Sequence, residues 1–101
     1  MKNIVLIGLM GSGKTTVGKA LSEKTGMKFV DTDELIVQKA RISIEQIFVQ
    51  EGEPVFRDLE SEVIEEVSRL ENIIVSTGGG AVLREENIEN LKRSGVLFCL
   101  S

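Results

Sequence analysis

Histidine is absent from this chain of 101 residues, and cysteine and proline occur once each, as Cys99 and Pro54. Without histidine, the chain cannot assemble a Ser-His-Asp or Cys-His catalytic group. A single cysteine also rules out an intrachain disulfide and a metal site built from clustered cysteine and histidine. Because Cys99 stands in an apolar run, the sequence predicts that its side chain is a small, buried hydrophobic group.

Long apolar runs are also missing, since none approaches the roughly 20 residues that a membrane-spanning helix needs. The amino terminus leads into a strand pattern without the layout of a signal peptide. We therefore expect a cytoplasmic protein that has no membrane partner. The net charge of −4 argues against nucleic acid as the main partner, so an anionic ligand would need a local binding site. The length suits one small domain.

One glycine-rich stretch at residues 8–16 fits the phosphate-binding pattern G-x-x-x-x-G-K-[ST]. An apolar run of strand character, residues 4–7, precedes it. After it, apolar residues recur at helical spacing, namely Val17, Ala20 and Leu21. A glycine-rich turn without function would also fit this composition. The order of strand, loop and helix favours a phosphate cradle instead.

The residue types in this stretch suit the binding of a nucleotide. Successive backbone N–H groups form an anion nest, and the following helix adds the positive end of its dipole. Glycine allows a positive φ and close approach of the backbone to phosphates, which we expect at Gly8, Gly11 and Gly13. Lys14 would bring a full charge to the β- and γ-phosphates, and the hydroxyl of Thr15 can bind Mg²⁺.

The remaining pattern alternates strands with helices, which predicts an α/β fold with a parallel sheet and helices on both faces. The expected strands are residues 2–8, 28–31, 73–76 and 96–100. Five helices are expected: residues 14–25, a helix after Asp31, a helix after Ser43, a helix from Pro54 to about Leu70, and residues 85–94. Gly26 would end the first helix, and Leu35 and Ile36 would be the buried residues of the second. Ser43 and Gln46 form a capping box, with Ile44, Ile47 and Phe48 inward. The longest helix carries an apolar stripe of Phe56, Leu59, Val63, Val67 and Leu70.

Three strand ends carry unusual chemistry: the glycine loop, Asp31 with Asp33, and the triple glycine at residues 78–80. In open α/β sheets, ligands bind at the carboxyl ends of strands. Asp33 could reach a metal or a substrate hydroxyl, or it could merely cap a helix. Three consecutive glycines indicate close approach of the backbone to another group.

Residues near the start of the longest helix could complete the site. Arg57 could hold a substrate carboxylate, although spacing alone favours an ion pair with Glu53. Glu60 could be solvated or could orient Arg57 from one turn away. Phe48 and Phe56 are expected in the core, and either could border a pocket.

These residues together resemble the shikimate kinase family. The resemblance rests on residues 8–18, on Asp31-Thr32-Asp33, on Phe56-Arg57 with Glu60, and on residues 78–82. It implies a three-layer α/β/α P-loop fold, like that of nucleoside monophosphate kinases, with the strands in the order 2-3-1-4. It also implies transfer of the γ-phosphoryl group of ATP to the 3-hydroxyl of shikimate, in the biosynthesis of chorismate and aromatic amino acids.

The resemblance also implies roles for individual residues. The ATP phosphates would be held by Gly11, Ser12, Gly13, Lys14, Thr15 and Thr16. Mg²⁺ would be bound by Thr15 and, through water, by Asp31. Shikimate would be bound by Asp33, Arg57 and Gly79. Lys14 and Asp33 would be the catalytic residues.

Family members extend well beyond the last residue of this chain, which lacks their mobile lid and further binding residues. We therefore expect residues 1–101 to form a single P-loop kinase domain, truncated at its C-terminus, monomeric, and weakly active by itself. The last strand would leave an apolar edge exposed. The alternatives are a P-loop module that binds nucleotide without catalysis, and a related gluconate or nucleoside monophosphate kinase.

Overall fold

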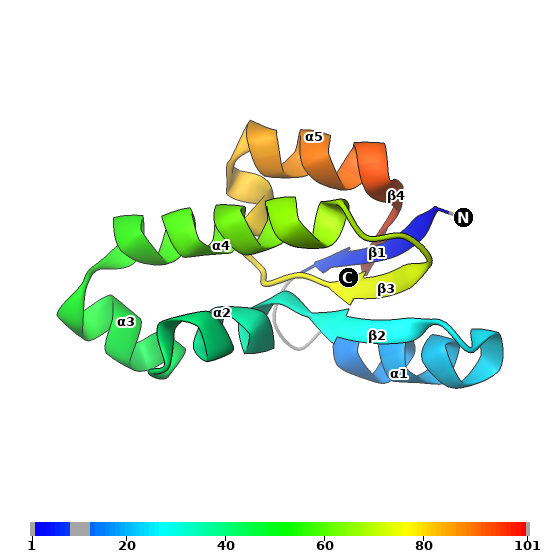
Figure 1. Cartoon of the computed structure of the whole chain (residues 1–101), viewed down its shortest axis with the longest axis horizontal. Coiled ribbons are helices and arrows are strands. Elements are labelled where there is room, and N and C mark those ends of the chain that lie inside the picture. Colours follow the sequence, from blue (N-terminus) through cyan, green and yellow to red (C-terminus); the bar gives the residue numbers. More distant parts are fainter. Residues whose placement is uncertain (1, 9–12, 101) are drawn as a thin grey trace.

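The computed structural model describes residues 2–8 and 13–100, and these form one sheet with helices on both faces (Figure 1). In chain order the elements are β1 Asn3–Gly8, α1 Lys14–Thr25, β2 Lys28–Asp31, α2 Thr32–Ala40, α3 Ile44–Gln50, α4 Glu53–Ser68, β3 Ile73–Ser76, the short 3₁₀ helix η1 Ala81–Leu83, α5 Glu85–Ser94 and β4 Gly95–Leu100. The predicted helices and strands are confirmed to within a few residues, and η1 is an addition to them.

The four strands are all parallel and lie in the order β2-β3-β1-β4, as expected. Neighbouring residues of a strand point to opposite faces, and both faces are covered by helices. Val5 and Val75 join the larger core beneath α4 and α5, whereas Leu6 and Ile74 join a smaller core that includes Leu21 of α1. The carboxyl ends of β1, β2 and β3 therefore meet at one edge of the sheet.

Local signals in the sequence place several helix ends correctly. Gly26 follows α1 with a φ of 74°, the left-handed conformation that glycine adopts without strain. Both hydrogen bonds of the capping box between Ser43 and Gln46 are present at the start of α3. Pro54 lies in the first turn of α4, where its missing N–H group costs no helical hydrogen bond.

Three expectations about burial are wrong. Leu70 lies beyond the end of α4, and its side chain is half exposed. It contributes to the fold through its carbonyl oxygen, which accepts a hydrogen bond from the side chain of Asn3. Phe48 stacks on the buried Phe56 but remains 38% exposed at the border of the core. Cys99 is exposed because β4 is an edge strand that packs mainly on β1 and α5.

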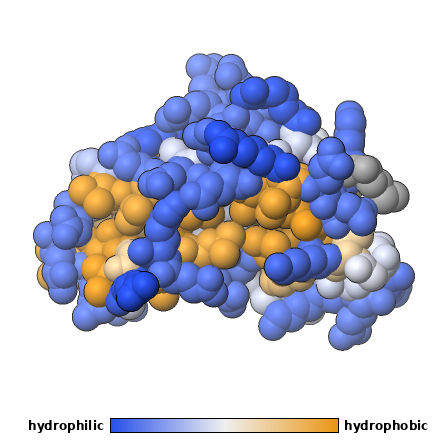
Figure 2. Space-filling view, in the orientation of Figure 1, coloured by the Kyte–Doolittle hydropathy of each residue, from blue (hydrophilic) through white to orange (hydrophobic). Residues whose placement is uncertain are grey.

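Apolar side chains also reach the surface. Figure 2 shows apolar surface gathered over α3 and along the line between α4 and α2. The exposed apolar residues of these helices include Val37 in α2, Phe48 and Val49 in α3, and Val55 in α4. The exposed apolar edge expected at β4 is confirmed, since Val96 and Phe98 are each about half exposed. Within the described residues, no helix combines the length and the apolar character that spanning a membrane requires.

Candidate active site

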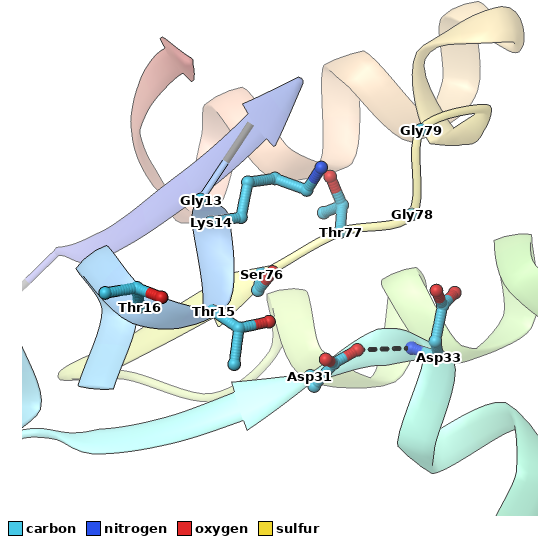
Figure 3. A pocket seen from close by; sticks show the side chains of 10 residues that line it. All are labelled: Gly13, Lys14, Thr15, Thr16, Asp31, Asp33, Ser76, Thr77, Gly78 and Gly79. Carbon is cyan, nitrogen blue, oxygen red and sulfur yellow. Dashed lines mark hydrogen bonds between the residues drawn. The ribbon is translucent and has the colours of Figure 1, made fainter. Parts of the chain in front are cut away.

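A cleft of about 310 Å³ opens at the carboxyl ends of β1, β2 and β3 (Figure 3). Its walls come from four segments: the start of α1, the passage from β2 into α2, the end of β3, and the glycine segment, by which we mean residues 77–80. The lining residues are Gly13, Lys14, Thr15, Thr16, Asp31, Asp33, Ser76, Thr77, Gly78 and Gly79. The cleft thus joins the strand ends that the sequence marked as unusual.

The wall formed by α1 carries the predicted phosphate-binding residues. Gly13 precedes α1 with a φ of 86°, and Gly8 ends β1 with a φ of 147°, as expected for positions that require glycine. The Nζ atom of Lys14 donates a hydrogen bond to the carbonyl oxygen of Gly8 at 2.6 Å. Gly11 and Ser12, which the sequence analysis assigned to phosphate binding, lie outside the described residues. Gly13, Lys14, Thr15 and Thr16 all line the cleft, so the amino end of α1, the positive end of its helix dipole, faces it.

The two aspartates after β2 have different positions and different partners. Asp31 is the N-cap of α2, because its Oδ1 atom accepts a hydrogen bond from the N–H group of Asp33 at 2.9 Å. The capping alternative considered for Asp33 therefore belongs to Asp31. The pKa of Asp33 is raised by burial and by the charge of Asp31, against opposing effects of Lys14 and Arg57. Asp33 is thus a half-buried carboxylate beside two cations.

Arg57 lies next to the cleft without lining it. Its Nη1 atom is 3.0 Å from Oε1 of Glu60, and its Nη2 atom is 3.6 Å from Oε2 of Glu53. Both ion pairs considered in the sequence analysis are therefore present. The side chain of Glu60 is only 1% exposed, and burial raises its pKa although the hydrogen bond from Arg57 opposes the rise. Glu60 is thus a buried group that orients Arg57, not a solvated one.

The glycine segment approaches these side chains so closely that larger residues would collide with them. A Cβ atom at Gly78 would lie 2.8 Å from Oδ1 of Asp33 and 3.2 Å from Oε2 of Glu60. At Gly80 it would lie 2.2 Å from Nη1 of Arg57. The close approach predicted for the glycines is confirmed at Gly78 and Gly80, which lie against the candidate substrate-binding side chains of Asp33 and Arg57.

Ser76 and Thr77 also line the cleft, and the sequence analysis assigned them no function. The backbone N–H group and the hydroxyl of Thr77 both donate to the carbonyl oxygen of Leu6, at 3.1 and 3.2 Å. These bonds continue the pairing of β3 with β1 by one residue. Their position at and directly after the carboxyl end of a buried strand was the available signal for these two residues.

The cleft offers oxygen atoms that suit a magnesium ion. Thr15 presents a hydroxyl toward Asp31 (Figure 3), and both residues line the cleft. Mg²⁺ prefers oxygen ligands and commonly takes one or two from the protein, completing its shell with water and substrate phosphates. Among the described residues, no group of three or more Asp, Glu or Cys side chains could enclose a metal ion. The residues therefore fit a metal shared with a phosphate ligand.

Comparisons with known proteins agree on one family. The family model described as shikimate kinase matches residues 10–101. The shikimate kinase of Caldicellulosiruptor saccharolyticus is 52% identical over 100 residues, which are 99% of this chain and 58% of that protein. The structure of shikimate kinase from Acinetobacter baumannii in complex with shikimate has a TM-score of 0.96 and 42% identity, covering 99% of this chain and 56% of that one.

A gluconokinase from Sinorhizobium meliloti is a more distant neighbour, with a TM-score of 0.60 and 29% identity over 97% of this chain and 55% of that one. The fold is thus shared beyond one activity, whereas the sequence is most similar to one family among these proteins. The chain spans a little over half the length of the relatives that it matches.

Proposed function

Since the chain belongs to the shikimate kinase family, we propose that it transfers the γ-phosphoryl group of ATP to the 3-hydroxyl of shikimate. The observation that carries the proposal is the placement of Asp33 in the same cleft as Lys14 and Thr15, with Arg57 at its border. The cleft thus brings together a carboxylate that could bind a substrate hydroxyl, a guanidinium that could bind a substrate carboxylate, and the residues that could bind the ATP phosphates. We also propose that the protein acts as a monomer in the cytoplasm.

The nucleotide side of the cleft would hold the ATP phosphates through residues 11–16. Phosphoryl transfer has a loose transition state, so catalysis depends on alignment and on neutralisation of charge. The ammonium of Lys14 would leave the carbonyl oxygen of Gly8 for the β- and γ-phosphate oxygens. Thr15 would bind Mg²⁺ directly and Asp31 would do so through water. The ion, when bound, supplies positive charge to the phosphates.

The opposite side would hold shikimate in line with the γ-phosphate. Asp33 would accept a hydrogen bond from the reacting hydroxyl and take its proton late in the transfer. Arg57 would bind the shikimate carboxylate with two N–H groups, and a backbone group of Gly79 would contact the substrate. Two contacts far apart on a small ring fix the direction from which its hydroxyl attacks.

The proposal is tested by measuring ADP release from ATP with shikimate, gluconate or AMP offered separately. The assay uses the protein expressed from its intact gene. We expect release that depends on shikimate alone. Release that depends on gluconate or on AMP would assign the site to another kinase. Gluconate is the first alternative because the Sinorhizobium meliloti neighbour is a gluconokinase. Nucleotide binding without release in any arm would favour a binding module.

A Gly80→Ala variant should bind shikimate roughly tenfold more weakly, because the new methyl group would displace the guanidinium of Arg57. The φ of Gly80 is −94°, which alanine adopts readily, so the effect would be steric and not conformational. Gly26→Ala is the control, since Gly26 has a φ of 74° and no atom within 4 Å of a new Cβ. It should lower the melting temperature and leave the KM for shikimate unchanged. Equal effects of both variants on KM would contradict the assignment.

A further inference from the structure

The glycine segment has no regular structure of its own until η1, so its position depends on bonds to its neighbours. It leaves β3 at Thr77 and enters η1, where the N–H group of Ala81 donates to the carbonyl oxygen of Gly78 at 3.1 Å. Ala81 is completely buried. Figure 1 shows η1 at the end of α5, beside α4, the helix that carries Arg57. Two side chains beyond the cleft, those of Asn87 and Arg84, join η1, which directly follows this segment, to its surroundings.

Asn87, in the first turn of α5, is 1% exposed and donates from Nδ2 to the carbonyl oxygen of Ala81 at 3.0 Å. Its Oδ1 atom has no hydrogen-bond partner. Burying an amide with an unpaired acceptor is unfavourable, so this residue contributes little to folding beyond the single bond. That bond fixes the turn that follows Gly78, Gly79 and Gly80.

Arg84, between η1 and α5, ties the end of η1 to α4. Its Nη1 atom is 3.0 Å from Oδ1 of Asp58 and 3.2 Å from Oγ of Ser61. Asp58 follows Arg57 directly in the sequence, and Ser61 follows Glu60. Arg84 therefore holds η1 against the turn of α4 that carries Arg57 and Glu60.

We propose that Asn87 and Arg84 are positioning residues for shikimate, acting through the glycine segment and Arg57. Asn87 sets the distance of Gly80 from α5, and Arg84 sets the position of Gly80 along α4. Together they keep the backbone of Gly80 against the guanidinium of Arg57, so close that a Cβ atom on Gly80 would lie 2.2 Å from Nη1. The inference rests on the proposed function, because it concerns how the same site holds its substrate. The ATP phosphates are held from α1, so their binding does not depend on these two side chains.

The test compares Asn87→Leu with a matched variant of another buried asparagine. Asn3 is also 1% exposed, and both of its side-chain groups are bonded, to Leu70 and Ile73, at the end of the sheet opposite the cleft. Leucine has the same number and branching of side-chain heavy atoms, with two larger methyl groups in place of the amide oxygen and nitrogen, and it cannot form these bonds; both variants carry the same increase in size. The melting temperature and the KM values for shikimate and ATP are measured for both variants, for Arg84→Ala and for the wild-type protein, each expressed from the intact gene.

We expect the two asparagine variants to separate stability from binding. Asn3→Leu should lower the melting temperature more, because it loses two satisfied bonds, and should leave both KM values unchanged. Asn87→Leu should raise the KM for shikimate roughly fivefold, the value of one net hydrogen bond, with the KM for ATP within about twofold of wild type. Arg84→Ala should raise the KM for shikimate in the same direction, and it serves as the test if Asn87→Leu does not fold.

The opposite outcomes overturn the inference. If the KM for shikimate follows the melting temperature in all variants, or the KM for ATP rises equally, these residues have only a structural role. An unchanged KM for shikimate in both Asn87→Leu and Arg84→Ala also refutes positioning. Failure of the proposed function is seen separately, as the absence of shikimate-dependent ADP release from the wild-type protein.

Discussion

An Asp33→Asn protein should lose at least about 99% of its kcat for shikimate phosphorylation while melting at a higher temperature than the wild-type protein. The loss follows from removal of the carboxylate that we propose orients the reacting hydroxyl and accepts its proton. Asparagine keeps the shape of the side chain, so ATP binding should be unchanged. Steady-state ADP release and differential scanning calorimetry measure the two effects.

The gain in stability follows from the raised pKa of Asp33. Between its unfolded value near 3.8 and its higher folded value, the folded chain binds more protons than the unfolded chain. The free energy of unfolding contributed by this group therefore falls as the pH rises through that interval, and at neutral pH the charged carboxylate is a net cost. Asparagine removes this cost, so the advantage of the variant should shrink toward acidic pH.

The control for this prediction is Glu65→Gln, which also removes one negative charge. Glu65 is exposed on α4 and pairs only with Arg69 among the contacts described. Its replacement should change neither kcat nor the dependence of the melting temperature on pH by much, because exposed ion pairs contribute little. A fall in the melting temperature of Asp33→Asn at neutral pH would contradict the interpretation of Asp33 as a strained, half-buried acid.

The proposed phosphate-binding side of this cleft follows from the sequence more directly than the proposed substrate side, and the reason is physical. The motif is local: a strand at residues 3–8, a glycine-rich sequence and a helix at residues 14–25 follow each other, so spacing alone describes the pattern. The choice between Asp31 and Asp33 as helix cap depends on where β2 ends. The two positions differ by two residues, about the precision with which a sequence pattern places the end of an element.

Arg57 shows what spacing cannot reveal. Its partners Glu53 and Glu60 lie on its own helix and were foreseeable, but its contact with Gly80 joins two elements that meet only in the fold. Gly80 has an ordinary negative φ, so it is needed for space and not for conformation. The errors at Phe48, Leu70 and Cys99 have the same origin, because an apolar pattern marks a face but not what covers it.

Replacing Arg57 with alanine should raise the KM for shikimate roughly 100-fold and leave the KM for ATP nearly unchanged. A forked, charge-assisted contact with a carboxylate is worth about 1.5–3 kcal/mol, which corresponds to roughly 10- to 150-fold in affinity. Arg57→Lys should recover only part of this, because an ammonium cannot bind both carboxylate oxygens in the same way. Arg69→Ala is the matched control, since Arg69 pairs with Glu65 four residues earlier, as Arg57 does with Glu53.

Loss of Arg57 should also destabilise the protein, because Glu60 is 1% exposed and would be left without its partner. The pKa of Glu60, already raised by burial, should rise further, so the loss of stability should be greater at neutral than at acidic pH. A double variant, Arg57→Ala with Glu60→Gln, separates the two roles of the arginine. It should restore much of the melting temperature but none of the affinity for shikimate. Recovery of both together would mean that Arg57 acts by holding the fold and does not contact the substrate.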